Sequence, residues 1–237
     1  MKNIPLIIPN FNQITYLQNL INWWRWYNPE NEIIIIDNGS TSEDLKMFYS
    51  QLRDIKVIFF PENNCALNLK TFLETAGHEY YVISDPDIMP HPATPPNFLE
   101  LMKYAVDNLG YHHAGFGLII NDIPAWIENK ANIQYNESQL LTVPVNFEYN
   151  GISYSGFRAP IDTTFSLYKK SNGGWHAPMS GEAWSNSLRI FEAFHLGWYI
   201  HPEYVNPEMD NYFTTAKYKD YTAISAGKNN NRPNKYI

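Results

Sequence analysis

The first half of the chain alternates short, continuously apolar runs with segments whose apolar residues recur at helical spacing. The runs IPLIIP and EIIIID have the composition of buried parallel strands, and KVIFF and EYYVIS are expected to be the third and fourth strands. Between them, apolar stripes recur every three or four residues, beginning with Ile14, Leu17 and Ile21. This β-α-β-α-β-α-β order predicts an α/β fold with a mostly parallel, doubly wound sheet and helices on both faces.

Polar residues fall where these predicted strands end. Asn10 and Asn12 follow the first run, and Asp37 ends the second. Asp85 ends the fourth run. Because ligands of doubly wound sheets bind outside the carboxyl ends of the strands, we expect these side chains to converge on one site.

Asp85-Pro86-Asp87 places two carboxylates one residue apart at such a strand end. The tripeptide fits a surface turn, since Asp and Pro favour turns, but it also fits a metal site. The first turn, PNFNQ, has no glycines that would let a helix N-terminus approach a diphosphate, and the sequence has no Walker loop. A diphosphate bound here needs another source of positive charge. We therefore expect Mn²⁺ or Mg²⁺ as cofactor, held by Asp85 and Asp87 together with substrate phosphates.

The second half gives weaker signals. AGFGLII and IDTTFSLY have the composition of strands, and a helix is expected after Pro96. Residues 124–160 read as irregular, and Glu182–His195 as a helix. Ser40 and Glu43 have the spacing of a capping box, and His112-His113 is expected at the surface.

Length and charge bound the class of protein. A chain of 237 residues with no convincing linker is expected to form one domain, with a nucleotide-type half over 1–110, an acceptor-type half over 111–225 and a mobile tail over 226–237. The net charge of −7 argues against a nucleic-acid partner. No apolar run is long enough for a membrane span or a signal peptide, and Cys65 is the single cysteine, so the protein is expected to be soluble and cytoplasmic.

Several stretches together resemble one family. IPLIIPNFNQITYLQNLI, EIIIIDNGST and YYVISDPDIMP resemble the family-2 glycosyltransferases of GT-A fold, and GFGLIINDIP, IDTTFSLY and HLGWY resemble a subgroup of them. The resemblance covers about residues 3–200. It implies an inverting, metal-dependent hexosyltransferase. Its donor would be a nucleoside-diphosphate sugar, with a UDP-sugar favoured, and its acceptor a carbohydrate hydroxyl in glycan or polysaccharide synthesis.

The resemblance also implies roles for individual residues. Asp87 would be the principal metal ligand, with Asp85 on the ribose or metal and His195 on the metal or diphosphate. The remaining nucleotide contacts would come from Pro9, Asn10, Asn12 and Asp37. Two residues depart from these patterns: Asn38 stands where many relatives have a second Asp, and Asn121 precedes Asp122 where the subgroup often has Asp-Asp.

A general base on the acceptor side must take the proton of the attacking hydroxyl. Asp162, which opens IDTTFSLY after its isoleucine, is the first choice, and Asp122 is the second. Either could instead have a structural role, Asp162 as a buried hydrogen-bond anchor and Asp122 as a turn residue. Trp198 is a candidate for stacking on a sugar, and it could equally belong to the core.

Two other classes fit part of the pattern. A metal-dependent phosphatase also places Asp-x-Asp after a strand, but Met89 stands where that motif has Thr, and three strands precede it here. A non-catalytic protein that binds carbohydrate or nucleotide could retain the fold without the chemistry. Turnover and metal dependence would distinguish that class from an enzyme.

Overall fold

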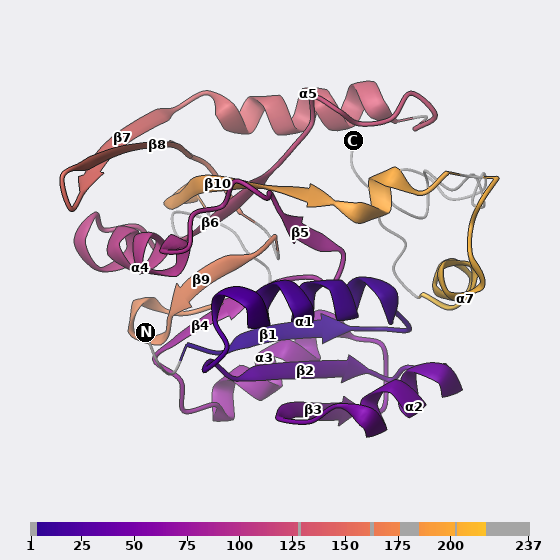
Figure 1. Cartoon of the computed structure of the whole chain (residues 1–237). Coiled ribbons are helices and arrows are strands. Elements are labelled where there is room, and N and C mark those ends of the chain that lie inside the picture. Colours follow the sequence, from indigo (N-terminus) through magenta and orange to yellow (C-terminus); the bar gives the residue numbers. More distant parts are fainter. Residues whose placement is uncertain (1–3, 128, 162–163, 176–184, 202, 217–237) are drawn as a thin grey trace.

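The computed structural model describes residues 4–127, 129–161, 164–175, 185–201 and 203–216 (Figure 1). The strands are β1 Leu6–Asn10, β2 Ile33–Asn38, β3 Ile55–Phe60, β4 Tyr80–Ile83, β5 Ile88–Pro90, β6 His113–Leu118, β7 Pro144–Tyr149, β8 Ile152–Arg158, β9 Ser166–Lys169 and β10 Ser187–His195. The α-helices are α1 Thr15–Tyr27, α2 Glu43–Gln51, α3 Cys65–Thr75, α4 Phe98–Asn108, α5 Lys130–Ser138 and α7 Pro207–Thr215. Short 3₁₀ turns are η1 Gln139–Leu141, η2 Lys170–Asn172 and η3 Leu196–Tyr199.

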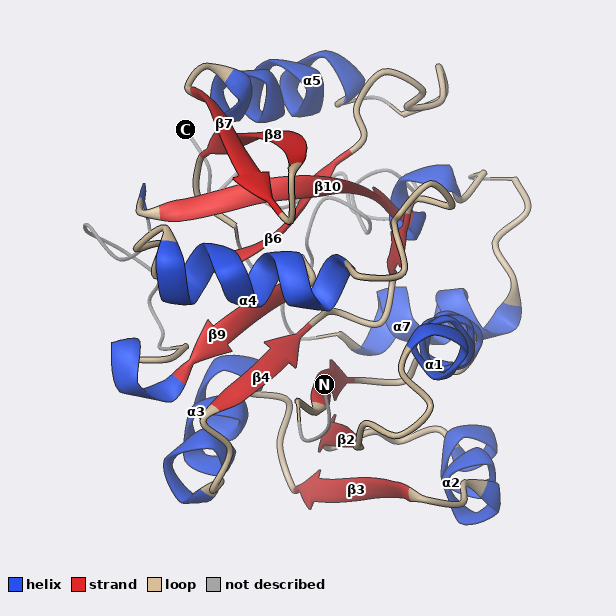
Figure 2. Cartoon of the chain, turned by 60° about the vertical axis from the view of Figure 1, so that its left-hand side comes forward, coloured by secondary structure: helices blue, strands red, loops and turns tan. Residues whose placement is uncertain are grey.

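The strands form one sheet in the order β3-β2-β1-β4-β9-β6-β10-β8-β7, with β5 pairing the end of β10 (Figure 2). The neighbours β3, β2, β1 and β4 are parallel, as are β6 and β10. β9 lies antiparallel between β4 and β6 and joins the two parallel groups. The expected α/β sheet with helices on both faces is confirmed.

β1 and β2 are buried on both faces, which explains their continuous apolar runs, whereas β3 at the edge of the sheet is only partly buried. Leu6 and Ile8 pack with α1 on one face, whereas Ile7 packs in the second core cluster with residues of α3. Each such side chain stabilises the fold by roughly 1.5–3 kcal/mol relative to exposure. The strand ends are thereby held in fixed positions.

β1 and β4 separate where Pro9 interrupts their ladder. The amide of Val82 donates to the carbonyl of Pro5, and that of Ser84 to Ile7. The next donor on this edge of β1 would be the nitrogen of Pro9, which carries no hydrogen. β2 and β4 lie on opposite sides of β1, so this gap is the topological switch point at which such sheets bind ligands. Asp85 comes two residues after β4 ends at Ile83.

Two expectations for the second half are wrong. Ser187–His195, inside the expected helix, is strand β10, because it pairs with β6 on one edge and with β8 and β5 on the other. Residues 124–160 contain α5 and the β7–β8 hairpin. The spacing of Leu188 and Phe191 also fits a helix, so pairing with distant strands decided the outcome.

Local details differ too. Ser42, not Ser40, caps α2, and its side chain accepts a hydrogen bond from the amide of Leu45. His113 is fully buried. The expected tail 226–237 lies outside the described residues. In the part of the chain that is described, no helix combines the length and the apolar character that a membrane span requires.

Candidate active site

A buried chain of hydrogen bonds connects the ends of β1 and β2. Asn10 pairs with Asp37 in the parallel ladder, and Tyr49 of α2 lies between their side chains. The amide Nδ2 of Asn10 donates to Tyr49 Oη at 2.8 Å, and Tyr49 Oη donates to Asp37 Oδ2 at 2.9 Å. Burial, followed by the charge of Asp37, raises the pKa of Tyr49, so the phenol stays protonated. Sequence reasoning missed Tyr49 because it lies in the apolar stripe of a helix.

Asp37 also fixes the loop that follows β2. Its Oδ1 accepts a hydrogen bond from the amide of Ser40 at 2.9 Å. A carboxylate has about four acceptor positions, so the two bonds made here leave capacity for a ligand hydroxyl or base N–H. Asp37 is nevertheless only 3% exposed.

The hydrogen bonds of Asn38 explain why Asn rather than Asp stands at this position. Its Nδ2 donates to the carbonyls of Asn10 and Ile36, and its Oδ1 accepts from Asn68 at 2.8 Å. An ionised Asp could not make the two donor contacts. At this position the amide holds together the ends of β1 and β2 and the start of α3.

Asn12 connects three segments. Its Oδ1 accepts from the amides of Thr41 and Ser42, and its Nδ2 donates to Thr215 Oγ1 of α7 at 3.0 Å. Its φ of +52° is a left-handed conformation that Asn tolerates better than most residues. Both side-chain polar atoms are engaged, so Asn12 holds together the loop after β1, the loop after β2 and α7.

Glu208 of α7 occupies the N-terminus of α1. Its Oε1 accepts from the amides of Ile14 at 2.7 Å and Thr15 at 3.0 Å, and its Oε2 accepts from Thr15 Oγ1 at 2.7 Å. α1 has no side-chain cap of its own. A helix N-terminus is a common anion site, and here a carboxylate of the same chain fills it. Because Glu208 occupies this site, the N-terminus of α1 is not available to bind a diphosphate.

Asp87 lies beside the end of β10. Its carbonyl accepts from the amide of Leu196 at 2.7 Å, and Ile88 pairs with His195 in the β5–β10 ladder. The His195 Nε2 atom is 3.7 Å from Asp87 Oδ2. This separation is long for a hydrogen bond, and it lies between the distances of about 3.0 Å and about 4.2 Å that separate adjacent and opposite ligands of an octahedral Mg²⁺ with bonds of about 2.1 Å.

Asp87 and His195 alone do not make a complete metal site. Asp87 is largely buried, and Asp85 two residues earlier is half-buried. Within the described ranges, no group of three or more His, Cys, Asp or Glu side chains is arranged to hold a metal ion. The donor chemistry of a carboxylate and an imidazole fits Mn²⁺ or Mg²⁺ only if phosphate oxygens or water supply the other ligands.

Trp198 packs against the ring of His195. The two rings stack at 4.9 Å between centroids with an interplanar angle of 14°. Trp198 is 3% exposed, in a cluster with Ile120, Ile123 and Ile127. One of its faces is therefore covered by His195, and the geometry favours a supporting role over the predicted stacking on a sugar.

Asp122 lies beyond the end of β6, exposed to solvent. Tyr199 Oη donates to its Oδ1 at 2.6 Å. Burial and this carboxylate both raise the pKa of Tyr199. Asp122 is thus accessible but already has a hydrogen-bonding partner. Asp162 lies outside the described residues.

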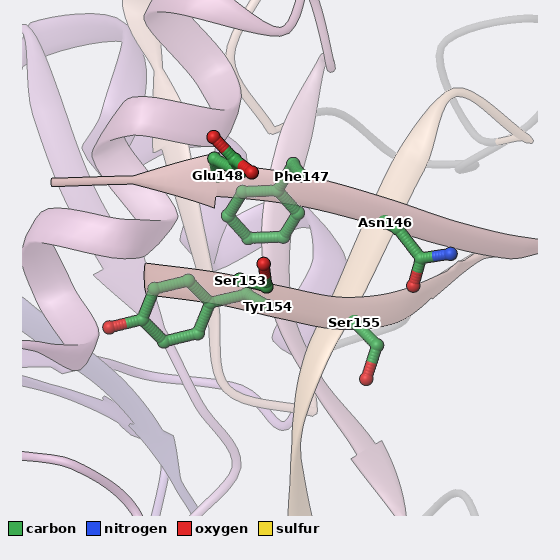
Figure 3. Close-up of a pocket in the computed structure, with 6 residues that line it drawn as sticks. All are labelled: Asn146, Phe147, Glu148, Ser153, Tyr154 and Ser155. Atoms are coloured by element: carbon green, nitrogen blue, oxygen red, sulfur yellow. The ribbon is translucent and has the colours of Figure 1, made fainter. Parts of the chain in front are cut away.

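A surface depression of about 490 Å³ lies elsewhere, on the β7–β8 hairpin (Figure 3). Its lining residues are Asn146, Phe147, Glu148, Ser153, Tyr154 and Ser155. None of the predicted site residues contributes to it, and β7 is an edge strand at the far end of the sheet from β1. It is not the candidate active site.

Strand order and the switch point define an α/β protein with a doubly wound, mostly parallel sheet. The model of the family described as glycosyl transferase family 2 matches residues 6–158, which is more than half of the chain. The chain belongs to glycosyl transferase family 2. No curated protein sequence gave a match.

Solved structures of glycosyltransferases have the same fold. One is the mannosyltransferase PcManGT from Pyrobaculum calidifontis in complex with GDP-Man and Mn²⁺, with a TM-score of 0.50, 13% identity, and coverage of 95% of this chain and 73% of that chain. Another is S. aureus TarS 1-349, with a TM-score of 0.51, 14% identity, and coverage of 82% and 60%. This chain thus spans less than two thirds of the TarS chain. These comparisons show that the chain has the GT-A fold.

Proposed function

We propose that this family-2 glycosyltransferase is metal-dependent and inverting, and that it transfers a sugar from a nucleoside-diphosphate sugar to a carbohydrate hydroxyl. The observation that supports this most is the His195–Asp87 pair at 3.7 Å, beside the switch point of the sheet. Glu208 at the N-terminus of α1 supports it independently, because it excludes the usual alternative site for a diphosphate.

The donor would lie across the ends of β1, β2 and β4. Pro9, Asn10, Asn12 and Asp37 would form the nucleotide side, with Asn12 acting through the loops it holds. Asp85 would contact ribose or metal, and Asp87 and His195 would hold Mn²⁺ or Mg²⁺. The bound cation would neutralise charge that develops on the leaving diphosphate.

Transfer is a single displacement. The acceptor oxygen forms a bond to the anomeric carbon while the bond from that carbon to the diphosphate oxygen breaks. The proton of the acceptor hydroxyl passes to a carboxylate, for which Asp162 is the first candidate and Asp122 the second. General-base catalysis of this kind contributes about 10²–10⁴-fold. Attack opposite the leaving group inverts the anomeric centre.

The donor site is tested by thermal unfolding with UDP, GDP or dTDP, each with and without Mn²⁺. We favour UDP, and GDP is included because the PcManGT complex contains GDP-Man. A nucleotide at a hundredfold excess over Kd should stabilise the fold by about 2.7 kcal/mol, and only with metal.

The matched variants are Asp87→Asn and Asp44→Asn, the latter an exposed carboxylate on α2. Asp87→Asn should abolish the metal-dependent shift, and Asp44→Asn should leave it in place. Absence of a shift with all three nucleotides would reject the donor site. Nucleotide or sugar binding without turnover would favour the non-catalytic alternative.

A further inference from the structure

Two loops lie side by side at the edge of the sheet that carries the proposed donor site. Residues 119–127 follow β6, and η3 with the residues up to Tyr204 follows β10. β6 and β10 are parallel neighbours, and beyond their ladder the amide of Ile119 donates to the carbonyl of Ala193 at 2.9 Å. Because the carboxyl ends of parallel strands meet at one edge of a sheet, both loops begin beside His195, the last residue of β10.

Contacts between the two loops fix their positions. The buried cluster around Trp198 packs one loop against the other. Outside this cluster, Tyr199 Oη donates to Asp122 Oδ1 at 2.6 Å, and the rings of Trp126 and His201 meet with 4.9 Å between centroids and an interplanar angle of 61°. Asp122 and Trp126 are therefore held in place by the fold although both are exposed.

Three aromatic rings lie next to one another on the surface of these loops. Trp126 is 43% exposed and Tyr204 is 78% exposed, and the ring of His201 contacts both, with 5.1 Å between its centroid and that of Tyr204. We call Trp126, His201 and Tyr204 the aromatic ledge. Aromatic side chains gain most from burial, so a group of exposed rings indicates a binding surface.

Hydrogen-bonding groups lie beside these rings. His201 Nδ1 accepts from the amide of Glu203 at 3.2 Å, so its Nε2 carries the proton and can donate to a ligand. The carboxylate of Asp122 has about four acceptor positions, and Tyr199 uses one of them. Aromatic rings next to a donor and a carboxylate suit a ligand with an apolar face and hydroxyl groups around it. A sugar ring has this chemistry.

The charge of the two loops also favours a neutral ligand. Residues 119–127 and 195–204 contain no Lys or Arg, whereas Asp122 and Glu203 are acidic. A phosphate group, a nucleic acid or an anionic lipid would be repelled here, because nothing in these loops neutralises its charge. An uncharged oligosaccharide would not be.

We propose that the aromatic ledge is a carbohydrate-binding site that holds the acceptor, with Trp126 as its main stacking surface. The inference rests on the proposed function, in which the acceptor is a carbohydrate. Trp198 cannot serve in this way, because His195 and apolar side chains cover it. Three neighbouring rings suit an oligosaccharide rather than a single sugar. The ledge follows the end of β10, so an acceptor bound there would lie next to the proposed metal site.

Two exposed tryptophans provide a matched comparison. Trp26 is 82% exposed near the C-terminal end of α1, about 16 Å along the helix axis from its first residue and far from the ledge. Trp126→Ala should raise the acceptor KM about tenfold, and Tyr204→Ala about threefold. Trp26→Ala should change the acceptor KM by less than about twofold. The Kd of the Mn²⁺–nucleotide complex should be unchanged in all three variants. Trp126→Tyr keeps a ring and should recover most of the loss.

Binding is measured without turnover by saturation-transfer NMR, in the presence of Mn²⁺ and UDP or GDP. The probes are tetrasaccharides of glucose, galactose, mannose and N-acetylglucosamine. At least one of them should bind to the wild type and to Trp26→Ala, with its affinity about tenfold lower in Trp126→Ala. The tetrasaccharide that binds then serves as the acceptor in the KM measurements.

The outcomes separate this inference from the proposed function. If no tetrasaccharide bound to the wild type, or if Trp126→Ala bound it as tightly as Trp26→Ala does, the inference would be wrong even in a chain that transfers sugar. If binding depended on Trp126 but no sugar was transferred, the ledge would be confirmed as a carbohydrate site and the proposed transferase reaction would be rejected.

Discussion

The parallel part of the sheet, β3 to β4, and the mixed part, β9 to β7, hold their polar groups in different ways. At the ends of β1 and β2, side chains hold each other, as in the chain from Asn10 through Tyr49 to Asp37. In the mixed part, side chains of β6 and β10 hold backbone carbonyls instead. The first arrangement fixes side chains at strand ends, and the second fixes a stretch of backbone.

This difference suggests a division of labour. The parallel part would bind the donor nucleotide, and the mixed part would present the base to the acceptor. Variants in the two parts should therefore separate binding from transfer. The predictions below test that separation, beginning with the largest expected effect.

Asp162→Asn should lower kcat by about 10²–10⁴-fold, because an amide cannot accept the acceptor's proton. Metal-dependent nucleotide binding should persist, since Asp162 is proposed to act on the acceptor hydroxyl and not on the donor nucleotide. Transfer is measured as nucleoside diphosphate released in the presence of acceptor, and binding by thermal shift. Asp122→Asn is the paired variant: full activity in Asp162→Asn together with lost activity in Asp122→Asn would assign the base to Asp122.

Glu208→Gln should destabilise the fold by about 1 kcal/mol, because the charge that caps α1 is lost while one amide oxygen remains to accept hydrogen bonds. The free energy of unfolding in urea measures the loss, and Glu62→Gln, at an exposed position, is the control. Metal-dependent nucleotide binding should survive. Nucleotide binding that became independent of metal would show that Glu208 had blocked a phosphate site on α1.

Asp107 is neither a proposed donor-site residue nor a proposed base, so its replacement should change only the stability of the fold. Burial raises the pKa of this carboxyl, but hydrogen bonds from Lys103, Lys169 and Tyr80 outweigh it and hold the pKa at about 2. Stability from a lowered pKa is present above the unfolded value of 3.8 and is lost as the pH falls towards 2.

Asp107→Asn should therefore flatten the decline in the free energy of unfolding across that acidic window. The effect should be no more than about 1 kcal/mol, because the network is near solvent. Unfolding in urea at stepped pH measures it. If the free energy of unfolding of the variant fell more steeply with falling pH than that of the wild type, or if its kcat changed, the claim that Asp107 contributes only to stability would be wrong.

The parallel part could be predicted from sequence because its determinants are local. Strands buried on both faces produce continuous apolar runs such as that of Ile33–Ile36, and the helical stripes between them are unbroken. The order of apolar runs and helical segments was enough to predict that Asn10, Asp37 and Asp85 lie at the ends of strands. The role of Pro9 in ending the β1–β4 ladder needed the register of the two strands.

The mixed part could not be predicted in the same way. β10 depends on partners in β5, β6 and β8 that are far away in sequence, so its own pattern did not distinguish strand from helix. His113 was expected at the surface because nothing in His112-His113 reveals that the carbonyl of Ile161 will face it. The Glu208 cap joins residues more than 190 positions apart.

The central claim is that Asp87 and His195 bind one metal ion together with the donor diphosphate. Pulsed electron paramagnetic resonance of Mn²⁺ with the protein and UDP or GDP tests it directly, because a nitrogen ligand couples to the manganese electron spin. We predict a nitrogen coupling in the wild-type complex that disappears in His195→Gln, and loss of bound Mn²⁺–nucleotide in Asp87→Asn. Tight Mn²⁺–nucleotide binding with no nitrogen coupling, or a coupling that survives in His195→Gln, would contradict the account.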